Sequence, residues 1–402
     1  MFPPLPRDPL LNTNNYPTKK DEAMSGPLNG VRVIEMAGIG PGPYACMLLS
    51  DLGAEVIRID RSGALGQPGD ISTRGRRSIA LNLKSEDGLA IARQLIDSAD
   101  MLVEGFRPGV MEKLGLGPEV CCQSNERLIF GRMTGWGQDG PLAKTAGHDI
   151  NYIALSGMLA SMGDADRPPP VPLNVAGDLG GGSLFLVMGM LAALHERSQS
   201  GRGQVIDAAI CDGAASLMTT LHGLRAIDFW DAQREHNMLD GGAPFYRNYE
   251  CKDGRYISFG AIEPQFYALL LDKLDIDFGG TDYSVQLNKA DWPRQREQIA
   301  ARVKEKTLAQ WCTIFDGTDA CVAPVVPLDE AIDHPHNAVR GNLVERDGVI
   351  QTGVAPRLSR TPGEIQSGPA VSGAQSRELL QELGFDTEKI ESLIAGNAVS
   401  TD

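Results

Sequence analysis

The segment 31–60, VRVIEMAGIGPGPYACMLLSDLGAEVIRID, decides the fold class because a strand, a helix and a second strand follow one another in it. Residues 31–36 have the composition of a buried strand, and a Gly/Pro turn separates them from an apolar helix at about 44–52. Gly53 suits the end of that helix, and 55–59 reads as the next strand. This order of elements predicts a parallel sheet with helices on its faces.

The same alternation continues towards the C-terminus. Ser85, followed by Glu86 and Asp87, is typical of a helix start. The further elements expected in this half are a helix to about residue 99, strands at 101–103 and 128–130, a long apolar helix at 179–196, a strand at 204–207 and a helix at about 211–232. We therefore expect an α/β fold whose large domain is Rossmann-like and has a parallel sheet.

The pattern changes after about residue 237. Lys252-Asp253-Gly254 separates two strand-like segments and predicts a hairpin. Helices at about 263–274, 291–304 and 307–316 and a short strand at 321–326 complete a smaller α+β domain. The predicted organisation is a flexible N-terminal arm at 1–25, a large domain at 26–230 and 335–402, and a small domain at 237–330.

Composition and charge exclude several classes of partner. The formal net charge of −15 argues against nucleic acid, which needs a basic face, although it leaves room for a small phosphorylated ligand. No apolar run reaches the ~18 uncharged residues of a membrane span, so we expect no membrane contact. Seven scattered cysteines without a CxxC motif predict reduced thiols. Neither a secretory signal nor a C-terminal peroxisomal signal is seen, which predicts a cytoplasmic protein.

The turn in segment 31–60 resembles a dinucleotide fingerprint. Gly38 and Gly40 follow a strand, and Asp60 ends the next strand 22 residues after Gly38. Pro43 occupies the third glycine position, however, and a proline has no N–H to offer a pyrophosphate. Arg61 follows Asp60 and suits a phosphate. A tight strand-to-helix turn is therefore the better interpretation than a nicotinamide site, and another nucleotide-bearing ligand remains open.

His148 and Asp178 are the candidates for acid–base chemistry. His148 lies in a loop-like segment before an apolar stretch, and histidine exchanges protons near neutral pH, although a buried structural histidine is the simpler alternative. Asp178 opens the long apolar helix, where a cap is the simple explanation and where the helix end would keep it ionised. Three glycines follow it, and the backbone N–H groups of Gly180 and Gly181 are candidates for an oxyanion site.

Two further sets of charged residues bear on function. Glu263 stands at a strand-to-helix junction, where it is either a helix-start carboxylate or a group that orients a histidine. The cations of the N-terminal half are candidates for phosphate binding, with a solvated surface as the alternative: Arg61, Arg74, Arg76, Arg77, Lys84 and Arg107.

Several segments together resemble the class III coenzyme A-transferase (CaiB/BaiF-like) superfamily. They are GPLNGVRVIE at 26–35, AGIGPGP at 37–43, DLGAEVIRIDR at 51–61, VEGFRPG at 103–109, RMTGWGQ at 132–138 and GRGQV at 201–205. Three more, GHDINY at 147–152, GDLGGG at 177–182 and GAIEPQF at 260–266, are similar to the α-methylacyl-CoA racemases within that superfamily. The resemblance implies a Rossmann-like large domain, a small domain and an interlocked homodimer whose sites lie between domains of different subunits.

The resemblance also implies roles for individual residues. His148 and Asp178 would exchange the α-proton of a 2-methylacyl-CoA thioester through an enolate, and Glu263 would pair with His148. The implied coenzyme A contacts are Arg61, Leu81, Leu83, Lys84, Gly105, Phe106, Arg107, Gly147, Asp149 and Tyr152. Lys113 stands where relatives have a phosphate-binding arginine, and it offers a point charge in place of a planar fork.

The expected activity is thus the interconversion of (R)- and (S)-2-methylacyl-CoA, with no metal and no cofactor, since coenzyme A is part of the substrate. A coenzyme A-transferase is the main alternative. In that class the residue at the position of Asp178 is a nucleophile that forms an acyl anhydride. A nicotinamide oxidoreductase and a non-catalytic acyl-CoA-binding protein are further alternatives.

Overall fold

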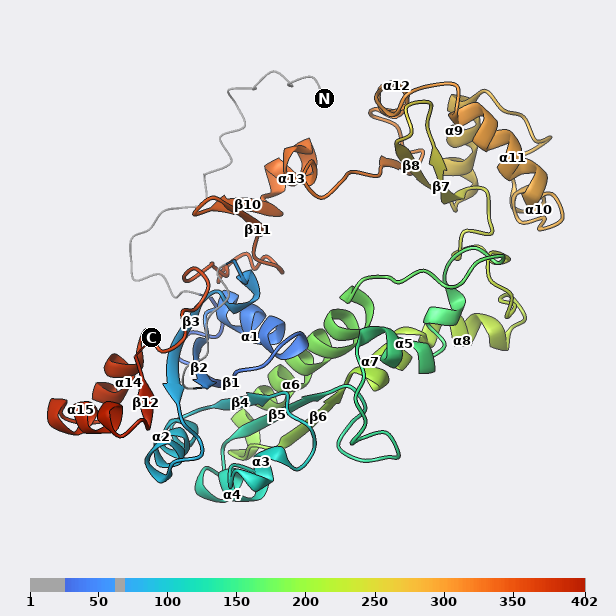
Figure 1. Cartoon of the computed structure of the whole chain (residues 1–402). Helices are drawn as coiled ribbons and strands as arrows, with labels where there is room; N and C mark the ends of the chain where they lie inside the picture. The colour runs from blue at the N-terminus through green and yellow to red at the C-terminus, as the bar shows by residue number, and fades with distance from the viewer. Residues whose placement is uncertain (1–25, 62–68, 402) are drawn as a thin grey trace. The chain divides into compact units, whose positions relative to one another are not determined.

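The computed structural model describes residues 26–61 and 69–401, so the predicted arm at 1–25 lies outside the described residues. The chain divides into two units (Figure 1). The larger contains the described residues of Glu22–Met158, Pro172–Thr219 and Ile332–Asp402. The smaller contains Leu159–Val171 as well as Thr220–Ala331.

The larger unit is built on a seven-stranded sheet with the order β12-β3-β2-β1-β4-β5-β6. All neighbours are parallel except β12, which pairs antiparallel with β3. The strands are β1 (Arg32–Met36), β2 (Glu55–Arg61), β3 (Arg76–Leu81), β4 (Met101–Glu104), β5 (Ile129–Thr134), β6 (Val205–Ala209) and β12 (Val399–Ser400). The predicted α/β fold is confirmed. From β3 to β6 the order is that of a Rossmann sheet, which changes direction between β1 and β4.

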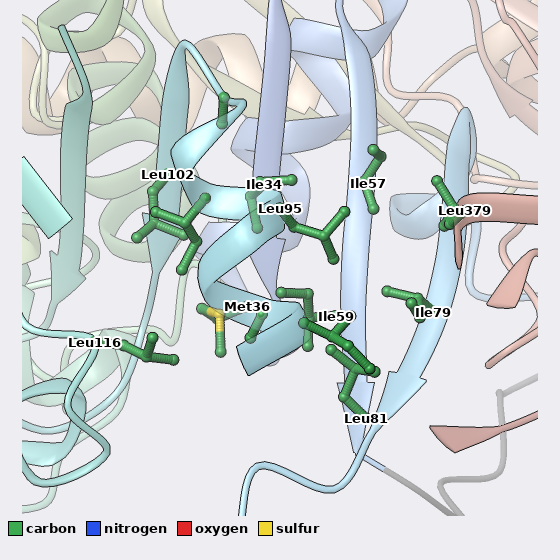
Figure 2. Packing of buried hydrophobic residues seen from close by; sticks show 14 of the residues in the cluster. Ile34, Met36, Ile57, Ile59, Ile79, Leu81, Leu95, Leu102, Leu116 and Leu379 are labelled. Atoms are coloured by element: carbon green, nitrogen blue, oxygen red, sulfur yellow. The ribbon is translucent and has the colours of Figure 1, made fainter. Parts of the chain in front are cut away.

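Helices cover both faces of this sheet because successive residues of its strands point to opposite sides. Ile34 and Met36 of β1 point to one face, where Figure 2 shows them with Ile57 and Leu95 in one cluster. Val33 points to the other face. The helices on the first face are α2 (Glu86–Asp97), α3 (Val110–Lys113), α4 (Pro118–Ser124), α14 (Ser376–Glu382) and α15 (Thr387–Ala395), and those on the second include α1 (Pro41–Asp51), α5 (Asp149–Leu155) and α6 (Leu184–Ser200).

The long apolar helix begins earlier than its pattern indicates. A π-helical segment, Val175–Ser183, runs into α6, and together they form a helix of 26 residues. This helix is long and apolar enough to span a membrane. A core helix of a globular protein can have the same length and composition. Leu186 and Met190 are buried against the sheet on the second face. One side of this helix therefore packs against the core of the larger unit.

Two expectations about elements are wrong. The helix predicted at 211–232 is two helices, α7 (Ile210–Leu217) and α8 (Thr219–Ala226). Strand β3 was not predicted, because its two arginines made the segment look like an exposed surface and not like a buried strand. The remaining elements of the larger unit are α13 (Pro335–Arg340) and a hairpin of β10 (Leu343–Arg346) and β11 (Val349–Thr352).

The smaller unit has its own sheet and core. Its strands β7 (Tyr246–Glu250), β8 (Tyr256–Gly260) and β9 (Val322–Pro324) form an antiparallel sheet in that order. Its α-helices are α8 from its second residue on, α9 (Pro264–Leu274), α10 (Tyr283–Gln286), α11 (Trp292–Val303) and α12 (Leu308–Phe315). Phe245, Tyr267, Trp292 and Trp311 are the large aromatic side chains buried in its core.

Candidate active site

A cavity of about 380 Å³ lies in the larger unit at the point where the order of the strands changes direction. Its wall contains the turn after β1 (Gly38 to Pro43), the turn after β4 (Gly105 to Pro108) and residues 133–136 at the end of β5. His148, Tyr152 and Asp178 complete the wall from the neighbouring loop and helices. Parallel sheets bind their ligands at this position, outside the carboxyl ends of the strands.

His148 stands at the start of α5 with an exposed side chain. Asn151 fixes its backbone, since the Asn151 side-chain oxygen accepts the His148 N–H at 3.1 Å and the Asn151 N–H donates to the His148 carbonyl at 2.8 Å. A buried structural histidine is therefore excluded. The anchored backbone leaves the imidazole on the wall of the cavity, where it can meet a ligand.

Asp178 is half-buried on the same wall, inside the π-helical segment and four residues after Asn174. Its backbone N–H donates to Oδ2 of the buried Asp149 at 2.6 Å. Burial raises the pKa of Asp178 most, and the negative charge of Asp149 raises it further. A hydrogen bond with Asn174 and the nearby His148 lower this pKa, but by less. This direction is opposite to our expectation of a helix end that favours the ionised form. A carboxyl group with a raised pKa is suited to giving a proton as well as taking one.

An aromatic pair forms the part of the wall next to His148. Tyr152 and Trp136 meet edge to face with their ring centroids 4.8 Å apart, and the Tyr152 hydroxyl donates to the Gly147 carbonyl. A side chain at residue 135 would not fit, because a Cβ on Gly135 would lie 2.1 Å from the Tyr152 ring. The sequence analysis gave Trp136 no role, although an aromatic residue just after a strand of a parallel sheet was a usable signal.

The glycines after Asp178 serve close packing between helices. A Cβ on Gly181 would lie 2.8 Å from the Ala214 backbone nitrogen of α7, and a Cβ on Gly213 would lie 1.8 Å from the Gly181 carbonyl oxygen. Neither Gly180 nor Gly181 lines the cavity described above. The close approach of α7 accounts for Gly181, and the oxyanion role of Gly180 and Gly181 stays a prediction.

The predicted coenzyme A contacts fall into three groups. Those on the cavity wall are Gly105, Phe106, Arg107, Gly147 and Tyr152. Those that are exposed and lie outside this wall are Arg61, Lys84 and Lys113. Arg61 is the last residue of β2 and Lys84 follows β3, so both lie at the carboxyl edge of the sheet. Those whose side chains are engaged inside the protein are Leu81, Leu83 and Asp149.

Leu81 is a predicted contact whose side chain is not available to a ligand. The side chain is 1% exposed and lies in the cluster of Figure 2, so only the backbone of Leu81 could make the contact, which stays a prediction. Leu83 is partly buried and packs against the same cluster. Asp149 accepts the Asp178 N–H and is 5% exposed, which makes it a support for Asp178. In each case a pattern of neighbours along the chain could not show which way the side chain points.

Three of the arginines considered for phosphate binding are held in ion pairs. Arg74 pairs with Asp51 at 2.6 Å and Arg76 with Glu35 at 2.9 Å, and all four side chains are buried. Arg77 contacts three carboxylates: Glu55, Glu378 and Glu382. The charges of these three candidates are already neutralised within the fold, which argues against a phosphate role for them.

Glu263 belongs to the smaller unit. It directly precedes α9 and its side chain is exposed. Its pairing with His148, which belongs to the larger unit, stays a prediction.

The fold and the cavity define an α/β protein with a ligand site at the switch point of a Rossmann-type sheet. The model of CoA-transferase family III matches residues 28–376, and the chain belongs to this family. The superfamily predicted from the sequence is confirmed.

Relatives within the family include enzymes with two kinds of name. The chain is 46% identical to the alpha-methylacyl-CoA racemase of Mus musculus and 42% identical to that of Homo sapiens, and each match covers 93% of this chain and 98% of the relative. It is 29% identical to the succinyl-CoA:glutarate CoA-transferase of Mus musculus over 93% of this chain and 90% of that protein. The racemases are thus much more similar to this chain than that transferase.

Solved structures support the fold. A CAIB/BAIF family protein from Brucella suis superposes with a TM-score of 0.76 at 24% identity, covering 89% of this chain and 100% of that chain. A hypothetical protein from Mycobacterium tuberculosis gives a TM-score of 0.74 at 24% identity, covering 88% and 99%.

Proposed function

We propose that this protein interconverts (R)- and (S)-2-methylacyl-CoA thioesters by moving the α-proton from one face of the substrate to the other. The observation that carries the proposal is the presence of His148 and Asp178 on the wall of one cavity at the switch point of the sheet. The identity of 42–46% to proteins named alpha-methylacyl-CoA racemase supports the same reaction.

The proposed chemistry needs two groups that exchange protons. One of the pair takes the α-proton, and the electrons of the broken C–H bond move into the thioester carbonyl to give an enolate. The other then donates its proton to the opposite face of the α-carbon, which restores the carbonyl and inverts the centre. A positioned acid or base contributes typically 10²- to 10⁴-fold to such a step. The raised pKa of Asp178 suits both of its roles, since the group must carry a proton in one direction and release it in the other.

The coenzyme A part of the substrate would bind along the carboxyl edge of the sheet. Arg107 lies on the cavity wall, and its side chain forms no ion pair with another residue of the described chain. Arg61 and Lys84 extend the positive charge past the ends of β2 and β3. In this proposal coenzyme A belongs to the substrate, and the proton transfer uses no further cofactor or metal.

A coenzyme A-transferase is the second candidate, because Asp178 could attack the thioester as a nucleophile. The exposed His148 on the same wall favours the racemase, since a transferase of this type needs a nucleophile and an acceptor acid but no second proton-transfer group. Glu263 would orient His148 in the assembled racemase, as the resemblance implies.

We also propose that two copies of the chain form a dimer. Apolar side chains stay exposed along and beside the helix Val175–Ser200, including Leu173, Leu184, Met188 and Leu217. An apolar surface of this kind marks an interface more often than a surface exposed to water.

The direct test starts from pure (R)-2-methylacyl-CoA and follows the (S)-epimer by chiral chromatography after hydrolysis. A racemase gives an equal mixture of epimers without any added carboxylic acid. Retention of the (R)-configuration, with hydroxylamine-trapped acylation of Asp178 when an acceptor acid is supplied, would establish the transferase instead.

A further inference from the structure

Three charged side chains form a network beside the cavity, although none of them lines it. Glu104 is the last residue of β4, and it lies opposite Arg132 in the pairing of β4 with β5. Arg132 donates from Nε to Oε1 of Glu104 at 2.9 Å and from Nη1 to Oε1 of Glu112 in α3 at 2.7 Å. This Glu104–Arg132–Glu112 network therefore ties two strands and a helix together.

The network also holds the turn that follows β4. The second oxygen of Glu104, Oε2, accepts the backbone N–H of Phe106 at 2.7 Å. Gly105, Phe106 and Arg107 of this turn lie on the cavity wall. One carboxylate thus receives the Arg132 guanidinium on one oxygen and the turn on the other.

The burial of the network explains why it can hold the turn rigidly. Glu104 is 1% exposed and Arg132 is 7% exposed, so water does not compete for their hydrogen bonds. Hydrogen bonds to charged groups are stronger than those between neutral groups, and more so in a buried environment. Burial raises the pKa of Glu104, which the Phe106 N–H and Arg132 oppose by hydrogen bonding to its carboxylate.

A buried ion pair at the other end of β4 shows what a purely structural pair looks like. Arg197 of α6 is 6% exposed and donates to Asp100, just before β4, at 2.7 Å. The hydrogen bonds of Arg197 go to Asp100 and to the Arg127 carbonyl, and none of these residues lines the cavity. The contact with the turn is therefore the special feature of Glu104.

We propose that Glu104 and Arg132 are positioning residues, which set the turn at 105–108 so that Arg107 meets a phosphate of the coenzyme A moiety. This inference rests on the proposed function for the kind of thioester that is bound. The network acts on binding of the nucleotide end of the substrate, which is distant from the α-carbon, and it takes no part in the proton transfer.

The test compares four variants with the unmodified protein: Glu104→Gln, Arg132→Lys, Arg132→Met and Glu112→Ala. The substrates are a 2-methylacyl-CoA and the same acyl group on pantetheine, which lacks the nucleotide. For Glu104→Gln we expect KM for the coenzyme A ester to rise about tenfold with kcat changed less than about twofold, because binding contacts act equally on ground and transition states. KM for the pantetheine ester should not change. Arg132→Lys, which keeps the charge, should show a smaller rise than Arg132→Met.

Arg197→Met is the matched control, since it removes the buried arginine that pairs with Asp100 at the other end of β4, and it should leave both KM values unchanged. Glu112→Ala removes a half-exposed partner and carries the test if Glu104→Gln does not fold, with an expected rise of about threefold for the coenzyme A ester only. Equal changes in KM for both esters, or no change for a folded Glu104→Gln or Glu112→Ala protein, would overturn the proposal.

Calorimetry with free coenzyme A separates this proposal from the proposed function. A protein that binds coenzyme A but does not epimerise the thioester refutes the racemase. The network is still tested in that case, because Glu104→Gln must weaken coenzyme A binding about tenfold while Arg197→Met must not.

Discussion

His148 and Asp178 are held by the fold in different ways. The structure fixes the backbone of His148 through Asn151 and leaves the ring exposed, whereas Asp178 is half-buried and its N–H is bound by Asp149. Asp149 follows His148 in the chain and also contacts Asp178, so one residue connects the two candidate proton-transfer groups. The charge of Asp149 consequently acts on Asp178 at short range.

The first prediction concerns pH. The pKa of Asp178 is raised by burial and by Asp149, so the reaction direction in which Asp178 takes the proton should lose activity below this raised pKa. Asp149→Asn keeps an oxygen that can accept the Asp178 N–H but removes the like charge, which lowers the pKa of Asp178. We expect the acidic limb of kcat/KM for one starting epimer to move to lower pH.

The measurement is a pH–rate profile for each starting epimer with the unmodified protein and Asp149→Asn. In the opposite direction Asp178 must be protonated in order to donate, so activity falls as the pH rises through the pKa of Asp178. This basic limb should lie at lower pH in Asp149→Asn than in the unmodified protein. An unchanged pair of profiles would show that the charge of Asp149 does not act on the reacting group.

At the scale of elements, the buried pair of Arg74 and Asp51 joins α1 to the C-terminal hairpin. Arg74 binds both oxygens of Asp51, the Gln351 side chain at 2.9 Å and the Thr352 carbonyl at 2.7 Å. Removal of one member leaves a buried carboxylate without its counterion. Arg74→Met should therefore lower the free energy of unfolding by about 3–5 kcal/mol.

Denaturant unfolding followed by circular dichroism checks this value. The double variant Arg74→Met with Asp51→Leu should recover much of the loss, because no unpaired charge remains. Lys389→Ala is the control, since the exposed pair of Lys389 and Asp87 is worth less than about 1 kcal/mol. Equal losses of unfolding free energy in Arg74→Met and Lys389→Ala would contradict the account.

The elements show which parts of the fold the sequence could predict. Apolar periodicity and turns predicted β1, β2, β4 and β5 close to their observed positions, because these strands are buried and short. Strand β3 contains two arginines, which look like a surface until their partners Glu35 and Glu55 are known. Partners 22 and 41 residues away are invisible to local patterns.

The site was predictable to a similar extent. His148, Asp178 and the turn at 105–107 were found through short motifs, and the structure places them on one cavity wall. The burial of the Leu81 side chain and the close packing of Gly181 against α7 were not predictable, because sequence alone does not show the direction of a side chain or the approach of another helix. Trp136 received no role because its contact with Tyr152 depends on tertiary structure.

At the scale of the whole molecule, we predict a dimer built over the exposed apolar side chains of the long helix. Light scattering should give twice the mass of one chain. Met188→Asp, which places a charge on this surface, should shift the protein towards the monomer and lower its activity, because Met188 is 60% exposed in the single chain.

Val120→Asp is the matched control, since Val120 is an exposed apolar residue of α4 on the opposite face of the sheet. It should leave the mass and the activity unchanged. An active monomer, or a dimer that Met188→Asp does not weaken, would refute this surface as the interface.

The central claim is that His148 and Asp178 exchange the α-proton from opposite faces, and solvent deuterium reports on it directly. The unmodified protein in deuterated water should introduce deuterium at the α-carbon of either epimer. Mass spectrometry and proton NMR measure this incorporation. His148→Ala and Asp178→Asn should each slow epimerisation at least ~10²-fold and slow exchange unequally from the two epimers, with opposite preference. No deuterium at the α-carbon with the unmodified protein, or equal exchange from both epimers in both variants, would contradict the account.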